Sequence, residues 1–205
     1  MTRRTKWNRW AALMIAATLG AALSACGAPS TSGEPAQPAL SVAKPDVPPP
    51  PPPRRPRKRT TEFELDGQRL ILPGPIVFET NSDRLSPVSD DFLEVVHDYL
   101  DAKPEITLLR IEGHMDNDGN PADNRRLSER RALSVARWFI AAGIKCDRLI
   151  PVGFGSSKPT VPNDTPDHKA MNRRIWFVNA SLRGGPIGGA PVDGGGKVAG
   201  DPCKD

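Results

Sequence analysis

Residues 106–139, ITLLRIEGHMDNDGNPADNRRLSERRALSVARWF, contain the change of pattern that decides the fold. Residues 106–114 are mostly apolar and rich in β-branched side chains, which is typical of a buried central strand. Residues 122–142 form the longest candidate helix, with an apolar stripe that includes Val135 and Phe139, and Gly143 is a good residue to end it. We therefore predict a strand, an acidic loop and an amphipathic helix in direct succession.

The flanking segments extend this pattern in both directions. Residues 69–73 and 75–79 are short apolar runs separated by proline and glycine, which predicts two strand pieces. Ser86 and Pro87 offer an N-cap and a first helical residue for a helix that ends before Pro104. Residues 148–155 and 173–180 supply the last strands, and a proline-rich loop, residues 156–171, separates them. The resulting order, βαβαββ, predicts an α/β (α+β) sandwich with two main helices on one face of a mixed sheet.

The N-terminal 25 residues have the three-part pattern of a secretory signal peptide. Basic residues precede a short apolar segment, which ends in small residues. The end of this segment, LSAC at residues 23–26, resembles the lipobox of bacterial lipoproteins, in which the cysteine carries the lipid. The resemblance implies a lipidated Cys26, and Gly27 after it implies sorting to the outer membrane of a Gram-negative host. The alternative is an ordinary signal peptide with an incidental cysteine.

Residues 26–61 cannot build a core, because they contain six consecutive prolines, residues 48–53, and a basic cluster, residues 54–59. We predict an extended tether between the lipid anchor and the folded domain. Residues 1–60 hold 10 of the 28 Lys and Arg and 2 of the 24 Asp and Glu, so the remainder is mildly acidic. This balance argues against a nucleic-acid partner for the folded part.

The chain has three cysteines, an odd number for an exported protein. Lipidation of Cys26 would leave Cys146 and Cys203, and two cysteines in an oxidising compartment usually pair. We predict that a Cys146–Cys203 disulfide tethers the tail, residues 183–205, which is glycine-rich and is expected to lack regular structure. Two free or separately paired thiols are the alternative.

Several blocks of the sequence resemble the OmpA-like C-terminal domain, the peptidoglycan-binding module that also occurs in peptidoglycan-associated lipoproteins and flagellar stator proteins. The blocks are residues 111–139, GFGSSKP at 153–159, NDT at 163–165 and NRRIWF at 172–177. The resemblance covers about residues 75–180, and the blocks occur in the family's order. It implies an OmpA-like domain at residues 62–182.

The same resemblance implies a binding site for the diaminopimelate of the peptidoglycan stem peptide, without covalent chemistry. The aspartate of the family's GHTD block matches Asp116, and the arginine of its LSxxRA block matches Arg131. Asn124 matches a helix asparagine of the same pocket, and Asn81 matches a pocket residue of the first βα connection.

The chemistry of the ligand agrees with this assignment. Diaminopimelate ends in a centre that bears an ammonium and a carboxylate, so a receptor needs one anion and one cation at a fixed separation. Asp116 can accept hydrogen bonds from the ammonium, and the planar guanidinium of Arg131 can bind the carboxylate through two hydrogen bonds. The less specific alternative is a surface ion pair between the two, which would contribute only about 0–1 kcal/mol.

Other functions fit the acidic loop poorly. A calcium loop aligned on Gly119 would have His114 and Arg125 at two important ligand positions. The three histidines lie on different predicted elements, which disfavours zinc, so we expect no metal and no cofactor. Glu112 and Asp116 could in principle perform acid/base hydrolysis, but the sequence marks no catalytic pattern around them. We expect that the protein is not an enzyme.

Two residues depart from the family pattern. Met115 stands where the family usually has threonine, and His168 stands at a frequent glycine position. The overall expectation is a lipid-anchored outer-membrane protein whose domain faces the periplasm, binds peptidoglycan and links the membrane to the cell wall. The alternative is a docking module for other envelope proteins, as in a Tol-Pal-like system, with weak or no wall binding.

Overall fold

The computed structural model describes residues 62–204, so the predictions for the signal peptide, Cys26 and the tether lie outside the described residues. The strands are β1 (Glu64–Asp66), β2 (Arg69–Ile71), β3 (Ile106–His114), β4 (Leu149–Gly155), β5 (Ile175–Leu182), β6 (Gly185–Pro186) and β7 (Lys197–Val198). The α-helices are α1 (Asp90–Ala102), α2 (Pro121–Ala141) and α3 (Pro166–Asn172). Short 3-10 helices are η1 (Pro87–Ser89), η2 (Cys146–Arg148) and η3 (Ile187–Gly189).

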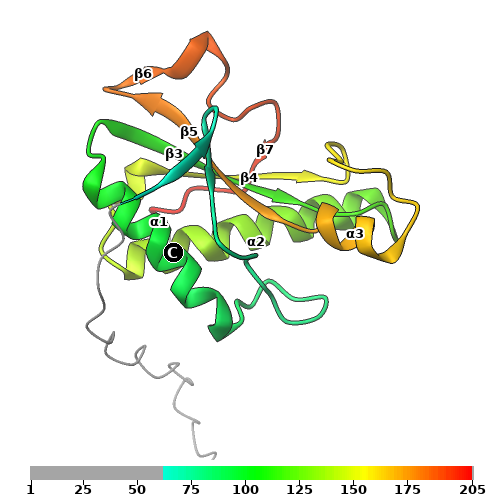
Figure 1. The fold of residues 1–205 in the computed structure, drawn as a ribbon. Coiled ribbons are helices and arrows are strands. Elements are labelled where there is room, and N and C mark those ends of the chain that lie inside the picture. Colours follow the sequence, from blue (N-terminus) through cyan, green and yellow to red (C-terminus); the bar gives the residue numbers. More distant parts are fainter. Residues whose placement is uncertain (1–61, 205) are drawn as a thin grey trace, which may run out of the picture. The chain divides into compact units, whose positions relative to one another are not determined.

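The strands form one mixed sheet in the order β1-β2-β5-β3-β4-β7, and β6 adds to β5 (Figure 1). β3 and β4 are parallel, which requires the long crossover that α2 provides, whereas the other paired strands are antiparallel. α1 and α2 lie on one face of the sheet. The predicted fold class is confirmed.

The apolar core lies between the sheet and these two helices. Leu93 and Leu100 of α1 and Phe139 of α2 are fully buried there, together with Leu109 and Ile111 of β3. The ring of Phe139 meets the edge of Phe177 on β5 at a centroid distance of 5.9 Å. Every second residue of β3 therefore faces the helices, as a strand half covered by helices requires.

α2 approaches the sheet closely because two strand positions have no side chain. A Cβ atom at Gly113 would lie 2.2 Å from the carbonyl oxygen of Ser128, and one at Gly153 would lie 2.5 Å from the side chain of Glu129. The helix starts at the predicted place, where the Asn120 side chain accepts from the amides of Ala122 and Asp123. These contacts hold the N-terminal half of α2 beside the loop that follows β3.

The prediction of a strand at residues 75–79 is wrong. Val77 satisfies its backbone groups with Ser86 and Ser89: its amide donates to the Ser89 hydroxyl, and its carbonyl accepts from that hydroxyl and from the Ser86 amide. Phe78 forms only an isolated bridge to Leu85. The segment is therefore a tight loop that packs on the start of α1, and its apolar residues do not indicate a ladder.

Two segments expected to be irregular contain regular structure. α3 lies inside the predicted proline-rich loop: Thr165 caps it by accepting from the His168 amide, and Pro166 occupies its first turn. His168 has ordinary helical backbone geometry, so this position does not need the family's glycine. The tail is not devoid of structure either, because β6 pairs with β5 and β7 pairs with β4.

The predicted disulfide between Cys146 and Cys203 is present, with Cα atoms 5.2 Å apart. Before Cys203, the tail crosses the face of the sheet that α1 and α2 leave uncovered. A Cβ atom at Gly196 would lie 2.4 Å from Val152, and the carbonyl oxygens of Val192 and Gly194 accept hydrogen bonds from Arg110 and Lys158. The tail is therefore part of the folded domain.

Candidate functional site

A cavity of about 690 Å³ lies where β3 ends and β5 begins. We call it the strand-end cavity. Its lining comes from the loop after β2, the end of β3 and the acidic loop, one side of α2, and the α3–β5 connection. All four sequence-predicted binding residues, Asn81, Asp116, Asn124 and Arg131, line it.

Asp116 is a buried carboxylate at the floor of the acidic loop, with 4% of its surface exposed. One carboxylate oxygen accepts from the Asp118 amide at 3.1 Å. The other oxygen lies 2.5 Å from a guanidinium nitrogen of Arg173. Among the described residues, the ionic partner of Asp116 is thus Arg173 and not Arg131, so the surface-pair alternative does not describe these two residues.

Arg131 projects from α2 on the opposite side of the cavity. Its Nε donates to the Ser82 carbonyl oxygen at 2.9 Å, and its guanidinium carbon lies 4.8 Å from the centre of the Phe78 ring. Burial lowers the pKa of Arg131, and the charge of Arg173 lowers it further, whereas Asp83 and Asp116 oppose these effects. A half-buried cation fixed by a carbonyl and an aromatic ring is well placed to meet an anion.

The two asparagines differ in their contacts. The side-chain amide of Asn124 donates to the carbonyl oxygens of Asp116 (3.2 Å) and Asp118 (2.7 Å), so Asn124 also fixes the acidic loop. Asn81 lies exposed at the tip of the turn before α1, with φ of 53°. Asparagine tolerates this left-handed conformation better than most residues, which gives its presence a conformational reason beside a binding one.

His114 is buried at the end of β3. Its Nε2 lies 3.1 Å from a carboxylate oxygen of Glu112, and its ring stacks on Phe154. Burial lowers the pKa of His114, although the hydrogen bond to Glu112 opposes this effect. A neutral ring that donates through Nε2 leaves Nδ1 as an acceptor, and Nδ1 is buried without a hydrogen-bond partner among the described residues.

Glu112, once considered as a catalytic acid, is held in its ionised form. Burial alone would raise the pKa of Glu112, but the hydrogen bonds and charges of His114 and Arg110 outweigh this effect and lower it. A general acid needs a raised pKa to carry a proton at neutral pH, so this geometry disfavours that role. Within residues 62–204, no group of three or more His, Cys, Asp or Glu side chains is arranged to hold a metal ion.

Sequence reasoning missed two contributions to the site. Arg173, in the NRR block, binds Asp116, while Lys169 of α3 pairs with Asp118 at 2.7 Å. The Met115 sulfur lies 3.5 Å from a guanidinium nitrogen of Arg131, so this departure from the family touches the predicted cation directly. The family block had marked the NRR stretch, but only the fold shows that its first arginine reaches the acidic loop.

A mixed sheet with two covering helices and a charged cavity at its strand ends defines a small ligand-binding domain. A model of the OmpA family matches residues 77–173, which include all four predicted binding residues. The chain is 39% identical over 118 residues to the outer-membrane lipoprotein YfiB of Pseudomonas aeruginosa, across 57% of this chain and 70% of that protein. The chain belongs to the OmpA family.

Other relatives extend the comparison. The peptidoglycan-binding protein ArfA of Mycobacterium tuberculosis is 38% identical over 105 residues, across 51% of this chain but only 32% of ArfA. The crystal structure of the peptidoglycan-associated lipoprotein from Burkholderia pseudomallei is 25% identical, covering 50% of this chain and 86% of that one, with a TM-score of 0.47.

No helix within residues 62–204 has the length and apolar character needed to cross a membrane.

Proposed function

We propose that this domain binds peptidoglycan non-covalently through the diaminopimelate of the peptide stem, at the strand-end cavity. The observation that carries the proposal is the convergence of Asp116, Arg131, Asn124 and Asn81 on one cavity, although they come from separate parts of the chain. The names of ArfA and the Burkholderia lipoprotein support it, since both refer to peptidoglycan.

The geometry suggests how the ligand is held. The ligand ammonium replaces Arg173 as the partner of Asp116, and Arg131 binds the carboxylate of the same centre. Arg173 is suited to this exchange because 42% of its side chain is exposed, whereas Asp116 is buried. The released Arg173 remains close enough to the cavity to contribute a second cation to the carboxylate.

The wider arrangement is also a proposal. Residues 1–25 are a signal peptide, Cys26 carries the lipid, and residues 26–61 tether the domain at residues 62–182 to the outer membrane from the periplasmic side. The tail, residues 183–205, completes this domain. The protein acts as a mechanical link between membrane and wall and not as an enzyme.

Sedimentation with purified sacculi tests the function. A fragment of residues 61–205 should co-sediment with diaminopimelate-type sacculi, and Asp116→Ala and Arg131→Ala should leave most of the protein in the supernatant. Arg137→Ala is a matched control, because Arg137 is exposed on the same helix as Arg131. Wild-type protein that stays in the supernatant would favour the docking-module alternative, and equal sedimentation of the variants would refute the site.

Sacculi with lysine in place of diaminopimelate test the role of Arg131 separately from that of Asp116. Their stem lacks the carboxylate that Arg131 is proposed to bind, but it keeps the ammonium for Asp116. Weaker retention of the wild type on these sacculi is expected. Equal retention on both types would contradict the role given to Arg131.

A further inference from the structure

A second cavity, of about 320 Å³, adjoins the strand-end cavity. The two share Pro75, Ile76, Arg174 and Ile175, so they meet at the start of β5. The second cavity opens between β2 and β5, where the paired residues end at Leu70 and Phe177. A ligand that fills the first cavity can therefore extend into the second without crossing a strand.

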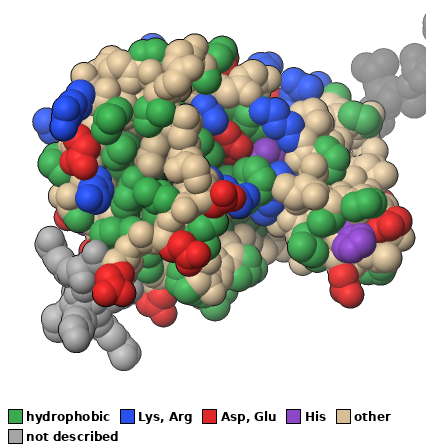
Figure 2. Space-filling model, turned by 45° about the horizontal axis from the view of Figure 1, so that its top comes forward, with side chains coloured by type: hydrophobic (Ala, Val, Ile, Leu, Met, Phe, Trp, Pro, Cys, Tyr) green, Lys and Arg blue, Asp and Glu red, His purple; other side chains and the backbone are tan. Residues whose placement is uncertain are grey.

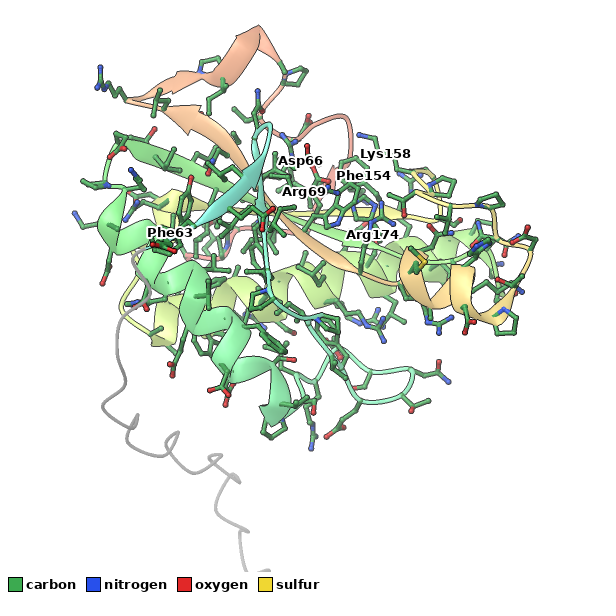
Figure 3. The ribbon with its side chains drawn as sticks, in the orientation of Figure 1. Phe63, Asp66, Arg69, Phe154, Lys158 and Arg174 are labelled. Atoms are coloured by element: carbon green, nitrogen blue, oxygen red, sulfur yellow. A yellow bond between two sulfur atoms is a disulfide. The ribbon has the colours of Figure 1, made fainter. Side chains whose placement is uncertain are left out.

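Two arginines dominate the chemistry of the second cavity. Arg69 and Arg174 both line it, and their guanidinium carbons lie 4.2 and 4.0 Å from the Trp176 ring centre. Lys158 lies over the Phe154 ring at 4.1 Å on the same face of the sheet, which is the face turned away from α1 and α2 (Figure 3). Figure 2 shows basic side chains gathered on this face around a histidine and an acidic side chain.

The protein uses only part of the hydrogen-bonding capacity of these arginines. Arg69 forms an ion pair with Asp66, and Arg174 donates to the carbonyl oxygens of Asn172 (3.0 Å) and Lys158 (2.9 Å). The Nε atoms of both arginines are buried and have no hydrogen-bond partner among the described residues. Buried donors are normally satisfied, so both arginines that line this cavity keep unused hydrogen-bonding capacity.

The charges give the same indication. Burial lowers the pKa of Arg174 to about 10; Glu112 opposes this shift and the positive charge of Arg69 adds to it. Two positive charges destabilise one another in a partly buried site, and an anion between them would relieve this repulsion. A carboxylate suits the planar guanidinium donors, and Trp176 offers an apolar surface to the atoms that carry it.

We propose that this second cavity, the Arg69–Arg174 subsite, binds a further carboxylate of the same peptide stem. This inference rests on the proposed function, since diaminopimelate in the strand-end cavity would deliver the rest of the stem to the junction of the two cavities. The stem offers two such carboxylates, one on the γ-linked glutamate that precedes diaminopimelate and one at the terminal alanine that follows it. Arg69 precedes the residues that the family model matches, whereas Arg174 and Trp176 belong to the NRRIWF block at residues 172–177.

Calorimetric titration of the full chain with three synthetic stem tetrapeptides tests the subsite. One tetrapeptide has both carboxylates free, one is amidated at the glutamate, and one is amidated at the terminal alanine. Wild type should bind one of the amides about tenfold more weakly than the free peptide, as loss of a charge-assisted pair implies, and the sensitive position identifies the carboxylate. Arg69→Gln should bind all three with the weaker affinity.

Arg69 is the better test position because Arg174 also donates to the backbone carbonyls of Asn172 and Lys158. Arg137→Gln removes the same charge from an exposed position and should keep the wild-type preference. Equal wild-type affinity for all three peptides, together with loss of binding in Arg131→Ala, would overturn the subsite and leave the proposed function intact. No binding of any peptide by the wild type would overturn both, and an equal loss in Arg69→Gln and Arg137→Gln would overturn the subsite as well.

Discussion

The two faces of the sheet differ in the chemistry of their side chains, although the same strands supply both. The face under α1 and α2 is apolar, with Leu109, Ile111 and Phe177 essentially excluded from solvent. The other face carries Arg110, Glu112 and other charged or aromatic side chains, and it is covered in part by the tail. The alternation of a strand thus separates the side chains that stabilise the fold from those available for recognition.

The largest expected effect concerns the helix-covered face. Phe139→Ala removes a fully buried ring from the core and should lower the free energy of unfolding by about 3–5 kcal/mol, measured by chemical denaturation. Phe154→Ala, on the other face, should cost less, because the tail segment against it is a loop that can close onto the space. An equal or larger loss at Phe154 would break the distinction between the faces.

Removal of the disulfide tests how much the packing of the tail on the face turned away from α1 and α2 stabilises the fold. Replacing Cys146 and Cys203 together by serine removes a link between residues 57 apart and should lower the free energy of unfolding by about 2–4 kcal/mol. Faster hydrogen exchange in β7 should accompany this loss, because its pairing with β4 is then no longer anchored. Unchanged stability and exchange would show that the tail adds nothing to the fold.

The buried His114, on the face turned away from α1 and α2, should make the stability of the domain sensitive to acid. The folded chain holds the pKa of His114 below its ordinary 6.5, so the unfolded chain takes up a proton first as the pH falls. The stability that His114 contributes is complete above pH 6.5 and is lost as the pH falls from there through the folded-state pKa.

His114→Gln keeps a donor for Glu112 but cannot titrate, so its unfolding free energy should fall less between neutral and mildly acidic pH. Chemical denaturation across this range measures the difference. His168→Gln is the control, since the His168 side chain on α3 is 38% exposed, whereas His114 is buried. If the unfolding free energy of His114→Gln depended on pH as strongly as that of the wild type, the effect could not be assigned to His114.

The smallest expected effect concerns the rim of the strand-end cavity. Asn81→Gly keeps the left-handed backbone without strain and removes only the side chain, whereas Asn81→Ala also introduces strain of about 1 kcal/mol. If the Asn81 side chain binds ligand, both variants should lose affinity for sacculi by a similar, modest factor. If only Asn81→Ala changes stability and binding, asparagine occupies this position because it tolerates the left-handed backbone conformation and not because its side chain binds ligand.

Periodicity was sufficient to predict the two main helices, the central strand and the mixed sheet, because their side chains pack on one continuous core. It could not predict the loop at residues 75–79, where Ser86 and Ser89 take the place of a neighbouring strand. The apolar pattern of such a loop is the same as that of a strand. α3 was missed because its signal, Thr165 followed by Pro166, is short and lies among other prolines.

The candidate site was predictable in its residues but not in its pairing. The resemblance to the OmpA-like domain indicated Asp116 and Arg131, and the structure places both on one cavity. That Asp116 binds Arg173 depends on how α3 brings the start of β5 to the acidic loop, which no local pattern contains. The Arg69–Arg174 subsite depends likewise on the pairing of β2 with β5.

Titration of the full chain with two stem tetrapeptides, one with meso-diaminopimelate and one with lysine at the third position, tests the central claim most directly. The α-groups of the third residue are in peptide bonds in both ligands, so both side chains keep the ammonium for Asp116, but the lysine side chain lacks the carboxylate proposed for Arg131. The site predicts measurable heat of binding for the diaminopimelate peptide, little or none for the lysine peptide, and loss of the diaminopimelate-peptide signal in Arg131→Ala. Equal binding of the two peptides, or a diaminopimelate-peptide signal that survives Arg131→Ala, would contradict it.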